Sequence, residues 1–176
     1  MTLKSKQPQG FTLIELIVVI VVLGVLAVVA APRFVSFSSD ANIAAIQAIE
    51  GSVKSTAEIY NTKAQIKASN GGFDAGFEVN GVAFELGYPV AASSNDTDDI
   101  PEIIEAMTLS EEVIFAALNV SVAPNGELSR LMALTILPDL ITPSTADIIA
   151  TNCFVSYRSY VSSNEPPVIE SVTTGC

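Results

Sequence analysis

The chain of 176 residues contains no histidine and no tryptophan. Histidine is the commonest general base and the commonest metal ligand among side chains, so its absence excludes Ser-His-Asp and Cys-His catalytic arrangements. The sequence also has no glycine-rich phosphate-binding loop. We therefore expect no catalytic residues, no cofactor and no metal site, and we predict that the protein is not an enzyme.

Positive charge is scarce as well. Eight lysines and arginines stand against 19 aspartates and glutamates, which gives a formal net charge of −11 at pH 7. Proteins that bind nucleic acid or anionic membranes by charge need clustered lysine and arginine. We therefore expect no nucleic-acid partner, and an acidic surface that keeps the protein soluble.

Two cysteines, Cys153 and Cys176, are the whole thiol content of the chain. In an exported domain, an isolated pair near the C-terminus indicates a disulfide. A zinc site is the competing interpretation, but two thiols without a histidine cannot complete a usual zinc ligand set. A disulfide here would stabilise the domain by roughly 3 kcal/mol in the chain-entropy account.

An uncharged apolar segment, residues 16–31, follows Glu15 directly. Counted from Phe11, it is long enough to cross a bilayer core of about 30 Å. An ionised glutamate at membrane depth costs roughly 2.5 kcal/mol or more without a partner, and the next cation along the chain is Arg33. The obvious partner is an α-amino group on Phe11, which exists only if the chain is cut after Gly10.

The N-terminus resembles that of a type IV prepilin. The resemblance rests on a leader with Lys4 and Lys6, the run Gly10-Phe11-Thr12-Leu13-Ile14-Glu15, and the apolar segment that reaches Pro32. Further stretches resemble the mannose-sensitive haemagglutinin (MSHA) pilins: Asn80-Gly81 with Leu86-Gly87-Tyr88-Pro89, Thr151-Asn152-Cys153-Phe154-Val155-Ser156-Tyr157, and the terminal Thr174-Gly175-Cys176.

The resemblance implies that a membrane prepilin peptidase cuts after Gly10 and methylates the new amine of Phe11. It implies that inner-membrane assembly machinery then builds a helical homopolymer, a pilus (fimbrium) outside a Gram-negative cell, used for adhesion, surface attachment and biofilm formation. We interpret the chain as the major subunit. Expected assembly residues are Glu15, Gly24 and Pro32. The segment from Gly24 to Pro32 would loosen during packing, although a mere kink without an assembly role is an equal alternative.

Several other interpretations remain open. A secretory signal peptide or a simple membrane anchor would also be apolar, but both leave Glu15 unexplained. A pseudopilin of a type II secretion system shares the N-terminal motif and is the main alternative. A membrane-tethered binding domain is more remote.

The predicted fold class is α+β. A long N-terminal helix, with a membrane-spanning half and an amphipathic half, packs on an antiparallel β-sheet head that has a C-terminal disulfide loop. An apolar stripe at spacings of three and four marks the amphipathic half, namely Ile43, Ile46, Ile49, Val53, Ala57, Tyr60 and Ala64. The expected domains are a leader at 1–10, a transmembrane or filament-core helix at 11–35, its amphipathic continuation at 36–69, and the head at 70–176.

Within the head, Asn80-Gly81 predicts a hairpin with a type I′ turn. Short helices are expected at residues 100–106 and 110–118, the second with Ser110 as its N-cap. Strands are expected at residues 131–137, 153–161 and 168–172. The acidic run at residues 95–99 has oxygen ligands suited to calcium but lacks the EF-hand glycine and glutamate, so a solvated loop is the favoured interpretation.

Overall fold

The computed structural model of the chain describes residues 11–69, 78–92, 100–110, 112–137, 140, 142–161 and 165–176, apart from the side chains of 31–36, 119 and 120. The chain divides into two compact units, Met1–Ser39 and Asp40–Cys176. The second unit therefore contains the amphipathic part of the long helix together with the head. The predicted leader and the acidic run at 95–99 lie outside the described residues.

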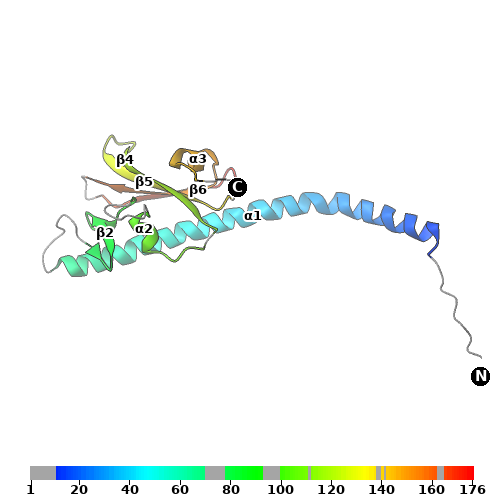
Figure 1. Cartoon of the computed structure of the whole chain (residues 1–176), viewed down its shortest axis with the longest axis horizontal. Coiled ribbons are helices and arrows are strands. Elements are labelled where there is room, and N and C mark those ends of the chain that lie inside the picture. Colours follow the sequence, from blue (N-terminus) through cyan, green and yellow to red (C-terminus); the bar gives the residue numbers. More distant parts are fainter. Residues whose placement is uncertain are drawn as a thin grey trace, which may run out of the picture. The chain divides into compact units, whose positions relative to one another are not determined.

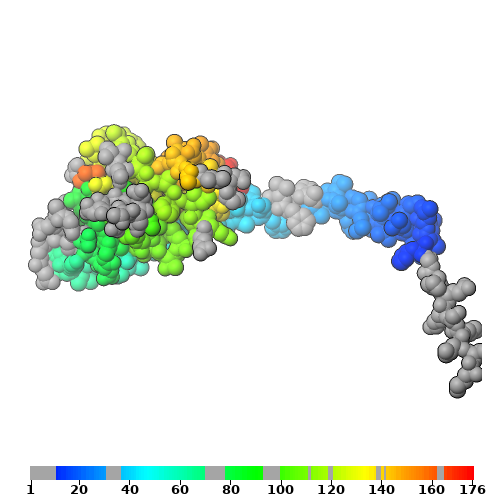
Figure 2. Space-filling model, in the orientation of Figure 1, coloured from blue at the N-terminus to red at the C-terminus, as the bar shows by residue number. Residues whose placement is uncertain are grey.

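The first unit consists of the start of helix α1, which spans Leu13–Ala68. Its window Leu13–Ala30 has a mean hydropathy of 3.2, and none of this window is buried (Figure 2). At 1.5 Å per residue, these 18 residues extend for about 27 Å. The segment is thus long and apolar enough to cross a membrane.

Helix α1 continues through Gly24 and Pro32 without a break. A kink or a loosening near these residues is compatible with a continuous helix, so both stay predictions. Proline lacks one backbone donor and so costs one hydrogen bond, while the bonds on either side keep the helix intact.

The second part of α1 carries the predicted apolar stripe. Ile46, Val53 and Ala64 are fully buried, and Ile49 and Ala57 are nearly so. The spacing of three and four residues places them on one side of the helix, where they pack into two clusters of the head. The stripe prediction is confirmed, and the helix ends at Ala68, within the predicted range.

A four-stranded antiparallel sheet forms the centre of the head, in the order β4-β5-β6-β7. Its strands are β4 (Ile114–Val122), β5 (Leu128–Thr135), β6 (Phe154–Tyr160) and β7 (Val168–Val172). Within this second unit, α1 lies along one face of the sheet and helix α3 (Thr145–Ala150) covers part of the other (Figure 1). We call the face opposite α1 the outer face.

A smaller antiparallel sheet, β1 (Glu78–Val79), β2 (Val82–Glu85) and β3 (Tyr88–Pro89), packs on the end of α1. Asn80 and Gly81 have φ of 56° and 86° at the turn between β1 and β2. Both central residues of a type I′ turn need positive φ, so the predicted hairpin is confirmed. The ion pair of Arg130 with Glu85 ties this sheet to β5.

The remaining helices and strands of the head agree with the predictions in part. Helix α2 (Glu102–Glu105) follows Pro101 as expected. The predicted helix at 110–118 is wrong: Ser110 accepts one turn hydrogen bond from the Val113 amide, and β4 begins at Ile114. Pairing of Ile114 to Leu118 with β5 supplies backbone hydrogen bonds that a short exposed helix could not match. Strands β5, β6 and β7 confirm the other strand predictions.

The C-terminal loop is closed by the predicted disulfide between Cys153 and Cys176. Cys153 is fully buried, within the cluster that holds Ile46, Val53 and Tyr157. Gly175 has no room for a side chain, because a Cβ there would lie 2.0 Å from the Thr151 carbonyl oxygen. Its amide donates to the Asn152 carbonyl at 2.9 Å. Close backbone contact thus explains the glycine that precedes Cys176.

We expect Cys153→Ser to lower the free energy of unfolding of the head by about 2–5 kcal/mol, because the open loop regains conformational freedom in the unfolded chain. Insertion of the apolar helix into membranes should be unaffected. Urea denaturation of the full chain in detergent, followed by circular dichroism, measures the change. The matched controls are Cys176→Ser and the reduced wild type, which should be destabilised to a similar extent. Free thiols in the unreduced wild type would contradict the bond.

Candidate functional site

The start of α1 is built by a reciprocal contact between Thr12 and Glu15. A Glu15 carboxylate oxygen accepts from the Thr12 amide at 2.9 Å and from the Thr12 hydroxyl at 2.8 Å. The Glu15 amide lies 3.4 Å from the Thr12 hydroxyl, to which it donates. This is a capping box, in which residues three apart satisfy each other's free backbone donors at a helix N-terminus. Glu15 therefore has a local structural role in addition to its proposed assembly role.

The capping box was missed by the sequence analysis, although its signal is present. A threonine followed three residues later by a glutamate, just before an apolar run, is the typical pattern. The carboxylate of Glu15 thus accepts local hydrogen bonds in addition to carrying a charge.

Among the described residues, Glu15 forms no ion pair. Phe11, the first described residue, is 92% exposed. Its backbone nitrogen stands four residues before Glu15, about one helical turn away along the chain. Gly10 lies outside the described residues, so the cut site itself stays a prediction.

Gly24 lies on an open surface of the apolar helix. A Cβ added there would meet no atom within 4 Å. Packing within the chain therefore gives no reason for a glycine at this position, and the assembly roles of Gly24 and Pro32 stay predictions.

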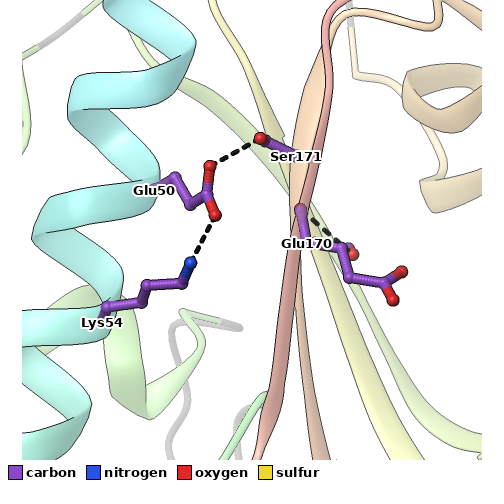
Figure 3. Close-up of polar contacts among 5 residues, drawn as sticks. Glu50, Lys54, Glu170 and Ser171 are labelled. Atoms are coloured by element: carbon purple, nitrogen blue, oxygen red, sulfur yellow. Dashed lines mark hydrogen bonds and ion pairs between the residues drawn. The ribbon is translucent and has the colours of Figure 1, made fainter.

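The head places a small polar network between α1 and β7. Glu50 accepts from the Lys54 ammonium and from the Ser171 hydroxyl, both at 2.5 Å (Figure 3). These hydrogen bonds lower the pKa of Glu50, with the Lys54 contact as the larger cause. The network ties the last strand to the helix.

The pKa shifts of two other titratable groups in the head have structural causes. Burial raises the pKa of Tyr157, whose hydroxyl donates to the Pro89 carbonyl at 2.7 Å. Hydrogen bonds from the Ser144 side chain and amide lower the pKa of Asp147 in the capping box of α3. Over the described ranges, no group of three or more histidine, cysteine or acidic side chains could hold a metal ion.

We expect Thr12→Val to loosen the first turn of α1 by about 1 kcal/mol, because the carboxylate of Glu15 loses its hydroxyl partner and the helix loses its cap. Hydrogen exchange at the Glu15 and Leu16 amides, measured on the full chain in detergent micelles, should become faster. Thr12→Ser keeps the hydroxyl and should exchange like the wild type. Equal protection in the valine and serine variants would show that the cap is unimportant.

Comparison with known proteins agrees with this N-terminal geometry. Residues 5–31 match the family model of the prokaryotic N-terminal methylation motif. No curated protein and no solved structure matches the chain. The match covers the second half of the predicted leader, the Thr12–Glu15 turn and the apolar window, and leaves the head unmatched. The chain thus carries a prepilin-type motif, which is found in type IV pilin-like and pseudopilin-like proteins and implies processing by a prepilin peptidase, contact with assembly machinery and a membrane-anchored precursor.

Proposed function

We propose that the chain is the precursor of a structural subunit of a type IV pilus of the MSHA type, and that it is the major subunit. The peptidase cuts after Gly10 and methylates Phe11, and the mature subunits polymerise outside the cell into a fibre used for attachment. The protein is a substrate of these enzymes and has no catalytic activity of its own.

One observation carries the proposal: an 18-residue apolar window of α1, none of it buried, starts within the Thr12–Glu15 turn and lies inside the matched motif. Such a surface needs a bilayer before assembly. It needs other copies of the same segment once it has left the bilayer. A helical homopolymer satisfies the second need, because each subunit supplies both a helix and the surface that covers the next helix.

Glu15 then sets the register between subunits. After the cut, the amine of Phe11 is positive and the carboxylate of Glu15 is negative, and a stagger between helices lets each meet its opposite on a neighbour. At about 4 Å and an effective dielectric near 20, the attraction is on the order of 4 kcal/mol. This is comparable with the cost of keeping the acid in an apolar bundle, so the pair mainly penalises misaligned docking.

A pseudopilin of a type II secretion system is the second candidate, because the methylation motif is common to both classes. The disulfide between Cys153 and Cys176 supports the pilin, since a fibre exposed outside the cell benefits from a covalently closed head. Electron microscopy of sheared surface fibres, with mass spectrometry of their subunit, separates the two. Long fibres made of this chain support the pilus, and short periplasmic assemblies support the pseudopilin.

We expect Gly10→Val to block processing, because a peptidase at the membrane surface needs close approach to the backbone and valine obstructs it. The full-length precursor should accumulate in the inner membrane, as intact-mass spectrometry will detect. Gly24→Val places the same side chain on an open part of α1 and should be cut normally. Fibres of processed subunits from Gly10→Val would refute the cut site.

We expect Glu15→Gln to be cut and to stay in the membrane but to form few or no fibres. Glutamine preserves the capping box and removes only the charge. Thr12→Val is the matched control: it removes the hydroxyl of the cap, keeps the carboxylate and should still polymerise. Fibre yield is counted by electron microscopy and processing by mass spectrometry. If Glu15→Gln polymerises as well as wild type, the charge does not set the register.

A further inference from the structure

Arg158 lies on the outer face of the sheet, and no helix of the described part of the chain packs on it. Neighbouring residues of a strand point to opposite faces, and Val155 and Tyr157 of β6 pack into the cluster beneath α1. Ser156, Arg158 and Tyr160 therefore belong to the outer face. Helix α3 covers this face around Phe154, so the Arg158 end of β6 is left open.

One terminal nitrogen of Arg158 holds the guanidinium in place. It donates to the Ser129 hydroxyl at 2.8 Å and to the Ser121 hydroxyl at 3.1 Å. The second terminal nitrogen and Nε form no hydrogen bond with any described residue, and Arg158 has no ion pair among them. A guanidinium fixed through one nitrogen presents its other two as a planar fork, which matches the two oxygens of a carboxylate.

The other described cations of the second unit are engaged within the subunit. Lys54 pairs with Glu50 and Arg130 with Glu85. Lys63 lies 4.3 Å from the centre of the Tyr60 ring, and Lys67 donates to a backbone carbonyl. Arg158 is the exception in a chain with 19 acidic residues, since its described partners are neutral hydroxyls. Among the described residues no acidic group pairs with Arg158, so its charge is available to an anionic group from outside the subunit.

A hollow of about 290 Å³ opens beside Arg158. Its lining includes Ser156, Tyr160 and Glu170, with Val168 and Pro124 as apolar walls. Tyr160 is only 8% exposed and forms part of the wall of the hollow. The carboxylate of Glu170 points away from α1, opposite to Ser171 (Figure 3). It forms no ion pair with Arg158 or with any other described cation.

We propose that this hollow binds a small ligand in which a carboxylate stands next to hydrogen-bond donors. The carboxylate takes the free fork of Arg158, and the adjacent donors meet the carboxylate of Glu170. Two sources carry this chemistry, a free α-amino acid with its ammonium and a uronic acid with its hydroxyls. The volume suits a single residue of either kind. The site goes beyond the structural function proposed above and does not depend on it.

The test is a titration of the oxidised full chain in detergent micelles. The chain has three arginines, so their Nε–H signals in a proton–nitrogen spectrum are few enough to assign by substitution. Glucuronate and L-alanine are the probes for the two sources. Glucose, which lacks the carboxylate, and acetate, which lacks the donors, are the matched probes. We expect saturable shifts of the Arg158 signal with glucuronate or alanine, and at least tenfold weaker binding of glucose and acetate.

Variants locate the binding. Arg158→Gln and Glu170→Gln should each weaken the bound probe, the first by at least tenfold. Because Arg158→Gln also removes the bonds to Ser121 and Ser129, Val168→Trp provides a second block by filling the hollow from its rim. Lys63→Gln changes the net charge equally on α1 and should bind like wild type.

Four outcomes overturn the proposal. The wild type binds neither glucuronate nor alanine, or it binds glucose or acetate as tightly as the better of those two probes. The other two are wild-type affinity for the bound probe in Arg158→Gln and wild-type affinity in Val168→Trp.

Discussion

The uncovered apolar surface at the start of α1 is the constraint on which the rest of the molecule depends. Its large side chains are about half or more exposed, from 46% at Ile17 to 76% at Val28. Burying one such side chain is worth roughly 1.5–3 kcal/mol, so the whole segment strongly disfavours water. Membrane anchoring and, in the proposed function, fibre formation are two ways to cover one surface.

The head uses the second part of α1 as a core element. Its stripe, together with Met132, Leu134 and Tyr157 from the sheet, forms the main cluster. The disulfide closes on the same cluster through the buried Cys153. Because these contacts all belong to the second unit, the head does not depend on what surrounds the apolar segment. Helix α1 thus has an apolar segment suited to a membrane and an amphipathic segment that packs on the head. The residue pattern changes from apolar to amphipathic near the division between the two units.

Much of this was predictable, because it depends on periodicity or on short-range signals. The apolar segment, the stripe, the Asn80-Gly81 turn and the last three strands all follow from local pattern. The segment 110–118 was predicted wrongly because Ser110 and two acidic residues imitate a helix start, whereas its pairing with β5 is a tertiary contact. Helix α3 was missed, although Ser144 and Asp147 form a second capping box. The Arg158 hollow could not be predicted, since strand register alone brings its residues together.

Glu15 has a local role in the structure and, in the proposed function, an assembly role as well. The capping box explains why a side chain that accepts hydrogen bonds follows Thr12 by three positions. Glutamine would serve that purpose as well as glutamate, so the cap accounts for the position of Glu15 but not for its charge. The positive end of the helix dipole favours the charge only modestly, by about 0.3–1 kcal/mol in exposed sites. At membrane depth, an unpaired carboxylate directly before the uncharged residues 16–31 costs more than that. In the proposed function, the compensating cation is the amine of Phe11, which the cut after Gly10 creates on every subunit.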